Sequence, residues 1–175
     1  MNWFLYGIGR DCHTKRLTIV IQIREYEAKK INRKNMRKSY FIIGRNDDQS
    51  TYAYSVGHYH IYNAIRLGKD VVYAVQNWMF RTDYKDIKRQ GRLGVIPISG
   101  SSVVGTNQGV TSMVIQNNQK IMGDVIHCIG DEYFVKDLEL VHLNGKHSKI
   151  EAEGWSKVYV CKKDGHYCFA APTLE

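Results

Sequence analysis

Short apolar runs, each closed by turn-forming residues, dominate this chain. The run Leu17–Tyr26 (LTIVIQIREY) is rich in β-branched residues and alternates with polar residues at its end. Runs of this length bounded by Gly, Asn, Asp or Ser are typical of strands, whereas a sustained 3.6-residue period is typical of a helix. The pattern therefore predicts strands at Leu17–Tyr26, Tyr40–Gly44, Thr51–Val56, Val71–Met79, Val95–Ile98, Val110–Ile115 and Ile121–Cys128.

Three dipeptides mark tight turns: Asn117-Asn118, Asn144-Gly145 and Asp164-Gly165. Asn-Gly and Asp-Gly favour type I′ turns because both central residues adopt positive φ at little cost. Helix is expected only in Ile61–Lys69, which Gly68 would close, and in the stretch after Thr82. We therefore expect a mainly β, antiparallel fold with one or two short helices.

The size and composition are those of a globular protein. The chain has 175 residues, a hydrophobic fraction of 43% and 2 prolines. No firm boundary interrupts it, so we expect residues 1–175 to form a single globular domain. The stretch Ser99–Gly109 (SGSSVVGTNQG) has the composition of an exposed loop.

The net charge of +8 favours an anionic partner such as a nucleotide, an RNA or an acidic surface. Six of the cations lie within ten residues, Lys29–Lys38 (KKINRKNMRK). This segment is either a solvated basic loop or helix that adds solubility, or a phosphate-attracting surface.

The location and the redox state follow from what the sequence lacks. The opening MNWFLYGIG has no basic n-region and is too short to span a membrane. The four cysteines form no CxxC pair and do not have zinc-finger spacing. We therefore expect a cytoplasmic protein with free thiols and no membrane contact, in the host cytosol if the protein is viral.

Three kinds of chemistry have weak support. His58 and His60 would share one face of a strand, but a catalytic metal needs a third ligand and none is close in sequence. His13 would suit a protease, but Ser101, Ser102 and Cys128 do not stand in a convincing glycine-flanked nucleophile turn. The GIGR segment (Gly7–Arg10) has two glycines, as a phosphate-binding loop would, but it does not follow a strand and open a helix, so it is not a dinucleotide-binding fingerprint. The sequence therefore predicts no metal and no cofactor.

Tyr84 and Lys88 remain as candidate catalytic residues. On a helix their spacing would put both side chains on one face. A phenol and an amine have reference pKa values of about 10 and 10.4, but a nearby ammonium lowers the pKa of the phenol and burial lowers that of a lysine. Together with a histidine they suit the attack of a ribose 2′-OH on its adjacent phosphodiester. The pair by itself fits an ordinary amphipathic turn equally well, because Tyr and Lys are often four residues apart.

Three segments resemble the poxins, the cyclic GMP-AMP nucleases of poxviruses, baculoviruses and some insects. The first joins VYAVQ (Val72–Gln76) to DYKDIK (Asp83–Lys88), which is similar to a family strand followed by the catalytic Tyr and Lys. The second is IGDEYFVKDLELVHLNGKHSKI (Ile129–Ile150), similar to a family hairpin. The third is GIGRDCHTK, which has His13 where the family has its catalytic histidine.

This resemblance implies a protease-like β-barrel or sandwich, a metal-independent mechanism and a homodimer. The implied activity is cleavage of a cyclic dinucleotide such as 2′,3′-cyclic GMP-AMP by 2′-OH attack, which would antagonise host immunity. His13, Tyr84 and Lys88 would be catalytic, with His58 and His60 as alternatives to His13. Residues expected to contact substrate are Arg81, Arg89, Arg92, Trp78, Tyr62, His58 and His60.

Two other functions remain open. One is a binding module that sequesters a nucleotide or RNA, or blocks a defence protein, without catalysis. The other is an endoribonuclease, because the closing segment VYVCKKDGHYCFA has a fainter similarity to viral EndoU-type enzymes, which use two histidines and a lysine for the same chemistry.

Overall fold

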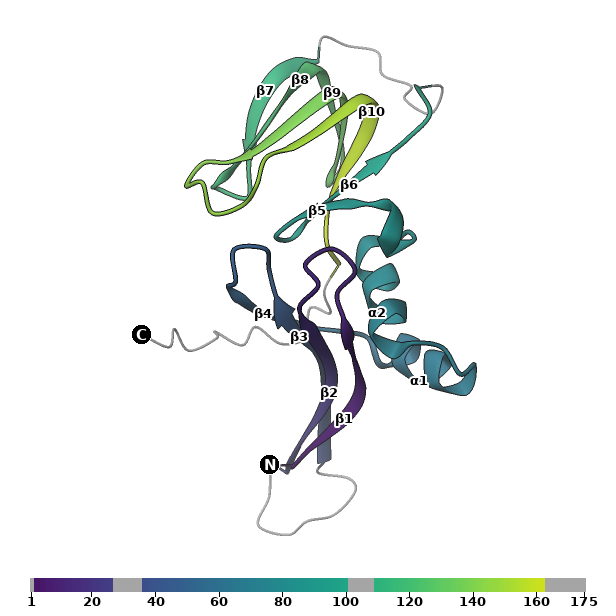
Figure 1. Cartoon of the computed structure of the whole chain (residues 1–175). Helices are drawn as coiled ribbons and strands as arrows, with labels where there is room; N and C mark the ends of the chain where they lie inside the picture. Colours follow the sequence, from purple (N-terminus) through teal and green to yellow (C-terminus); the bar gives the residue numbers. More distant parts are fainter. Residues whose placement is uncertain (1, 27–35, 101–108, 163–175) are drawn as a thin grey trace. The chain divides into compact units, whose positions relative to one another are not determined.

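The chain forms two compact units, each with its own antiparallel sheet (Figure 1). The computed structural model describes residues 2–26, 36–100 and 109–162. Unit 1 comprises Met1–Arg81 with Lys162–Glu175, and unit 2 comprises Thr82–Cys161. The predicted mainly β fold with two short helices is confirmed. In the described residues both sheets stay open rather than closing into a barrel, and the single domain over 1–175 stays a prediction.

Unit 1 begins with a four-stranded meander in the order β1-β2-β3-β4. Strand β2 coincides with the predicted run, because its β-branched residues alternate between the two faces of the sheet. The sequence pattern missed β1, whose apolar residues are largely exposed. The bounds are β1 Asn2–Arg10, β2 Leu17–Tyr26, β3 Met36–Arg45 and β4 Thr51–Ser55.

Two helices follow the sheet. Helix α1 covers His58–Arg66, and Gly68 has a φ of 62° where the chain leaves it, as predicted. Helix α2 covers Val71–Phe80. The predicted strand Val71–Met79 is therefore wrong.

Two signals in the sequence explain why Val71–Phe80 is helical. The buried side chains of α2 recur with a helical period, at positions 71, 72, 75, 76, 79 and 80. The carboxylate of Asp70 accepts a hydrogen bond from the backbone N–H of Tyr73 at 2.9 Å, which caps the first turn. Burial on one side of the helix outweighs the strand preference of its three valines.

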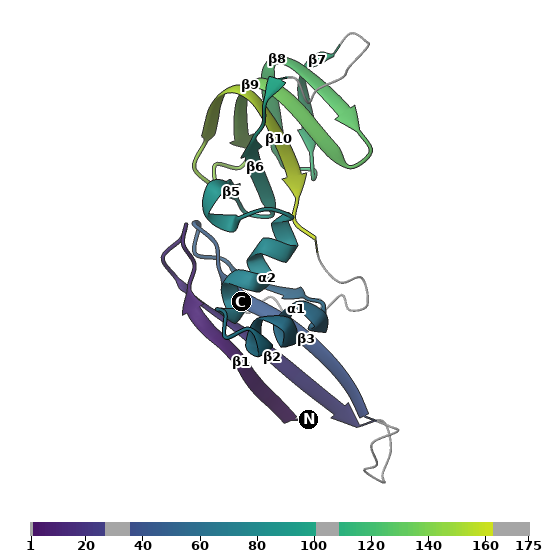
Figure 2. The same cartoon turned by 90° about the vertical axis from the view of Figure 1, so that its right-hand side faces the viewer.

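Helix α2 packs closely on β1 because β1 carries two glycines. A Cβ at Gly7 would lie 2.9 Å from the Cβ of Val71, and one at Gly9 would lie 3.6 Å from that of Val72. Both helices cover the same face of the sheet (Figure 2). Gly7, which lies against α2, is aligned with Val20 of β2, and Tyr40, which contacts α1, is aligned with Gln22 of β2. Val20 and Gln22 are two residues apart in one strand, so they point to the same face.

Unit 2 consists of a short 3₁₀ turn and a six-stranded sheet in the order β5-β6-β10-β9-β8-β7. Its core is formed by aliphatic side chains from the inner face, including Leu93, Val135 and Val158, each 1% exposed or less. The bounds are η2 Tyr84–Asp86, β5 Lys88–Gln90, β6 Leu93–Pro97, β7 Val110–Ile115, β8 Gln119–Ile129, β9 Glu132–His142 and β10 Ile150–Val160.

The structure places turns at both predicted positions that it describes, but neither predicted dipeptide has positive φ at both of its residues, as a type I′ turn would require. Gln116 and Asn117 have φ values of 50° and 64° in the hairpin between β7 and β8. Gly145, at 66°, lies in the connection between β9 and β10. The turn at Asp164-Gly165, most of Ser99–Gly109 and the start of the basic segment Lys29–Lys38 lie outside the described residues.

Two further predictions concern thiols and membranes. Among the described residues Cys12, Cys128 and Cys161 form no disulfide, and Cys168 lies outside those residues. Within the described ranges, neither helix is long and apolar enough to cross a membrane.

Candidate functional site

Tyr84 is a buried residue of unit 2. Its exposed fraction is 0%, and its hydroxyl accepts a hydrogen bond from Nη1 of Arg89 at 2.7 Å. The expected helix that would carry Tyr84 and Lys88 on one face is wrong, because η2 ends at Asp86 and Lys88 begins β5. A catalytic base must lie within hydrogen-bonding reach of its substrate. In this conformation the Tyr84 hydroxyl instead holds a neighbouring guanidinium.

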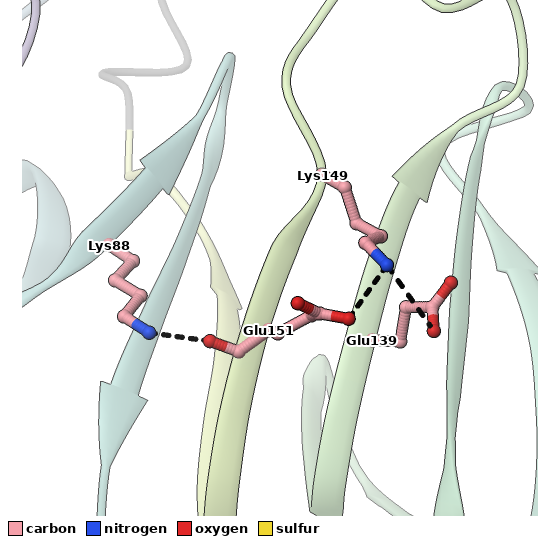
Figure 3. A network of polar contacts seen from close by, with 4 residues as sticks. All are labelled: Lys88, Glu139, Lys149 and Glu151. Carbon is pink, nitrogen blue, oxygen red and sulfur yellow. Dashed lines mark hydrogen bonds and ion pairs between the residues drawn. The ribbon is translucent and has the colours of Figure 1, made fainter.

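Lys88 is exposed and lies among carboxylates. Its ammonium donates a hydrogen bond to the backbone carbonyl of Glu151 (Figure 3). It lines an open pocket of about 660 Å³ on unit 2. Four acidic residues share that lining: Asp137, Glu139, Glu151 and Glu153. Such surroundings disfavour the binding of a phosphate beside Lys88.

Lys149 links two of these carboxylates across β9 and β10. Its Nζ lies 2.7 Å from Glu151 and 3.9 Å from Glu139 (Figure 3). The hydrogen bond from Lys149 lowers the pKa of Glu151, and Glu151 in turn raises the pKa of Lys149. Both groups therefore stay charged near neutral pH, which keeps the acidic character of the pocket.

His13 lies in the turn between β1 and β2 of unit 1. One oxygen of the Asp11 carboxylate accepts the backbone N–H groups of His13 and Thr14, at 2.8 and 2.9 Å. The other oxygen accepts a 2.9 Å hydrogen bond from the buried amide of Gln76. The turn is thus fixed to α2, with the His13 side chain half-buried. Because His13 belongs to unit 1 and the Tyr84–Lys88 pair to unit 2, the catalytic trio stays a prediction.

The three arginines expected to contact substrate, Arg81, Arg89 and Arg92, differ in their surroundings. Arg89 bridges the hydroxyl of Tyr84 and the carbonyl of Gly91, the latter at 2.8 Å. Arg81 adopts a left-handed conformation, with a φ of 54°, where α2 ends. Arg92 has a buried Nε for which the described residues offer no hydrogen-bond partner. Neither the contacts of Arg89 nor the conformation of Arg81 requires a ligand.

His58 and His60 do not share a face, because they lie two residues apart on helix α1 rather than on a strand. His60 lies beside Trp78, with ring centroids 5.3 Å apart, and Lys162 approaches the same indole at 5.4 Å. Burial, and then the charge of Lys162, lower the pKa of His60. Trp78 is thus packed between two unit 1 side chains instead of standing free to stack on a base.

The structure brings two predicted substrate residues, His58 and Tyr62, into a cluster of aromatic rings on unit 1. The ring of Tyr62 lies 5.8 Å from Tyr6 and 6.0 Å from Tyr40. His58 lies 6.2 Å from Tyr62 and 6.0 Å from Tyr40. The cluster therefore joins β1, β3 and α1.

Hydrogen bonds order this cluster. The hydroxyls of Tyr40 and Tyr62 are 2.9 Å apart, and those of Tyr6 and Tyr62 are 3.4 Å apart. The amide of Gln22, which is fully buried, donates to Tyr40 at 2.6 Å. Nε of Arg24 donates to the amide oxygen of Gln22 at 2.6 Å. A buried glutamine thus fixes the orientation of both an arginine and a tyrosine.

Cations and exposed rings continue the cluster along the strands. The guanidinium of Arg24 lies 4.0 Å over the ring of Phe4. Lys38 is aligned with Arg24 across β2 and β3, so the two cations share one face of the sheet. Phe4 is 39% exposed and Tyr62 is 42% exposed. The tyrosine–arginine surface, as we name it, consists of Phe4, Tyr6, Arg24, Lys38, His58 and Tyr62.

Sequence reasoning missed three members of this surface, Phe4, Tyr6 and Arg24, whereas Lys38 belongs to the basic segment that it singled out for phosphate attraction. One signal was available: Gln22 and Arg24 are polar residues two apart in an otherwise apolar run, so they point to the same face of β2. A buried polar residue in a strand must find a partner, and that partner is another polar side chain here.

The net positive charge of the protein comes entirely from the unit that holds this surface. Unit 1 contains 16 Lys and Arg residues against 8 Asp and Glu residues, whereas unit 2 contains 9 of each. The net charge of +8 therefore belongs to unit 1. No protein-family model, curated protein or solved structure matches the chain, so the resemblance to the poxins stays a prediction.

Proposed function

We propose that unit 1 binds a nucleotide or single-stranded RNA on the tyrosine–arginine surface, without a requirement for catalysis. The observation that carries the proposal is the position of Arg24 and Lys38 beside exposed aromatic rings, on the unit that holds the whole net positive charge. Proteins that bind single strands combine the same two elements, a cationic track for phosphates and aromatic rings for bases.

The cations supply attraction for phosphate. Arg24 offers five N–H donors, of which the bond to Gln22 uses one. Lys38 lies directly across the ladder from it, on the same face of the sheet. Such contacts attract a phosphate chain but do not distinguish one base from another.

The aromatic rings supply the base-binding element. Stacking of one base on one ring is worth about 1–3 kcal/mol. Tyr62 and Phe4 expose enough ring to accept a base, and the packing of Tyr62 against Tyr6 and Tyr40 holds its ring in place. A ring that is already fixed loses little side-chain entropy when a ligand binds.

The tyrosine hydroxyls favour binding over proton transfer. The hydrogen bond with Tyr62, followed by burial, raises the pKa of Tyr6 above its ordinary value of 10.0. Tyr6 therefore stays a neutral phenol at physiological pH, able to donate a hydrogen bond but not to act as a base. This is the behaviour expected of a recognition surface.

Fluorescence anisotropy with a labelled single-stranded RNA and a labelled cyclic dinucleotide tests the proposal. Tyr62→Ala should weaken binding about tenfold, because a stacking ring is lost. Tyr59→Ala is the matched control, since Tyr59 is a more exposed tyrosine of the same helix that lies outside the surface. Equal losses in the two variants, or no binding of either probe at low salt, would contradict the proposal.

A second pair of variants tests the charge. Arg24→Ala should weaken binding about tenfold, because a charge-assisted contact to phosphate is lost. Arg10→Ala removes the same charge from the same unit at the far end of β1, and should change the affinity less than about twofold.

We propose secondly, from the resemblance to the poxins, that the protein cleaves a cyclic dinucleotide by 2′-OH attack. The fixed turn at His13 supports this proposal, because a catalytic imidazole needs a defined position. Incubation with 2′,3′-cyclic GMP-AMP in EDTA should then give a linear product that His13→Ala loses. Intact substrate after long incubation would leave binding as the function.

A further inference from the structure

A second hollow lies on unit 1, on the face of the sheet that the helices do not cover. It has a volume of about 390 Å³, within the usual range for small-molecule sites. Ile19 and Ile43 are paired across β2 and β3 and line its floor. Their neighbours in sequence, Val20 and Ile42, point to the helix-covered face, so Ile19 and Ile43 point to the opposite one. The two-arginine pocket, as we name it, is lined by Arg16, Leu17, Ile19, Ile43, Gly44, Arg45 and Thr51.

The floor of this pocket is aliphatic. Ile19 and Ile43 are half-buried, and Leu17 is 59% exposed. An exposed leucine beside two half-buried isoleucines leaves apolar area in contact with water, which a ligand with an apolar body would cover. None of the lining residues is aromatic, so the floor offers no ring on which a base could stack.

Two guanidinium groups complete the lining. Arg16 directly precedes β2 and Arg45 ends β3, the neighbouring strand. Among the described residues neither guanidinium makes a hydrogen bond or an ion pair. The acidic residues nearest in sequence are Asp47 and Asp48, and the Asp48 carboxylate accepts hydrogen bonds from the N–H and hydroxyl of Ser50.

We propose that the two-arginine pocket binds a small amphipathic carboxylate, a ligand with an aliphatic body and one anionic head. The aliphatic body would lie on Leu17, Ile19 and Ile43. The carboxylate would accept hydrogen bonds from both Arg16 and Arg45, whose planar guanidinium groups match its two oxygens. The Thr51 hydroxyl is a further donor in the lining.

This inference does not rest on the proposed nucleotide function. The tyrosine–arginine surface lies on the helix-covered side of the sheet, and the pocket lies on the other side. The ligand classes also differ, because one surface offers aromatic rings and the other only aliphatic side chains. Each proposal can therefore fail without the other.

Isothermal titration calorimetry with the full chain tests the pocket. Decanoate, below its aggregation concentration, is the probe. Decanol tests the apolar body alone and acetate the charge alone. We expect decanoate to bind at least about tenfold more tightly than either. Equal binding of decanol and decanoate would overturn the proposal, as would no binding of decanoate.

Variants then assign the site. Arg45→Ala and Arg16→Ala should each weaken decanoate binding about tenfold, while Arg45→Lys, which keeps the charge but loses the planar donor pair, should recover only part of the affinity. Arg66→Ala, which removes an exposed arginine of helix α1 on the other side of the sheet, should leave it unchanged. Both arginines are exposed, so the variants should fold, which circular dichroism checks.

Two further outcomes would overturn the assignment. Unchanged decanoate binding in both arginine variants would place the ligand elsewhere. Binding of adenosine monophosphate with the same dependence on Arg16 and Arg45 would make the pocket a nucleotide subsite instead.

Discussion

At the scale of single residues, burial decides which candidate groups can meet a ligand. Tyr84 has a plausible sequence neighbourhood for catalysis, yet its hydroxyl is buried against Arg89. Tyr62 lies in an ordinary helical sequence, yet its side chain is 42% exposed and packs beside two other tyrosines. Whether a tyrosine can reach a ligand thus depends on its surroundings rather than on its identity.

His60 predicts how stability changes with pH. Its pKa in the folded protein is below the ordinary 6.5, chiefly because of burial, so the unfolded chain binds the proton more readily. The contribution of neutral His60 to stability is therefore complete above 6.5 and is lost as the pH falls below that value. Urea unfolding of the wild type and of His60→Gln at about pH 7.5 and about pH 5.5 measures it.

We expect the wild type to lose more free energy of unfolding over this interval than His60→Gln does. Lys162→Met should lie between them, since it removes only the second cause of the shift. An identical pH dependence in wild type and His60→Gln would refute the role of His60.

At the scale of elements, the packing of helix α2 on strand β1 accounts for the helix and for the two glycines of the strand. Helix α2 is built from residues that favour strands, yet it packs on a strand that offers two glycines. Close approach of backbone to backbone needs such glycines. The helix therefore depends on a sequence more than sixty residues away, which no local pattern contains.

Two glycine substitutions test this packing. Gly7→Ala should destabilise the protein by about 1–3 kcal/mol, because its Cβ would lie only 2.9 Å from Val71 Cβ. Gly9→Ala is the matched control: its Cβ would make an ordinary 3.6 Å contact with Val72, so the change should stay within about 0.5 kcal/mol. Urea denaturation measures both.

The double variant Gly7→Ala/Val71→Gly removes the opposing Cβ, so Gly7→Ala should cost less in a Val71→Gly background than in the wild type. Equal stability of the Gly7 and Gly9 variants would show that β1 and α2 do not pack as described.

At the scale of the whole molecule, charge separates the two units. Unit 1 carries a net charge of +8 and unit 2 none, although both are β-rich and similar in size. Lys88 and Arg89 contribute to the basic total, but they belong to the neutral unit and have acidic or tyrosine neighbours. The total net charge is thus a poor guide to where an anion binds, and the charge of each unit is a better one.

The salt dependence of RNA binding tests this separation. Each phosphate contact that is lost should reduce the slope of log affinity against log salt by about 0.7 for a single strand. Lys38→Ala should show this reduction. Lys146→Ala, an exposed lysine of unit 2, should leave the slope unchanged. The same slope change in both variants would mean that the two units contribute alike.

The sequence by itself determined most of the strands. Strands β2 and β7 begin and end where alternation and turn residues predicted, because these signals act between neighbours along the chain. The hairpin between β7 and β8 followed from its turn residues, and α1 and its closing glycine from a local period. It also determined the basic character of the chain and pointed to three members of the candidate surface, Lys38, His58 and Tyr62.

Only the tertiary structure decided where those residues lie and which of them come together. The helix α2 needed a glycine-bearing strand to pack on, and the burial of Tyr84 needed its neighbours in unit 2. The tyrosine–arginine surface joins residues of four separate elements, with Tyr6 and Tyr62 56 positions apart. Contacts of that kind depend on which faces of the strands and helices meet, and that is a property of the folded chain rather than of any segment of it.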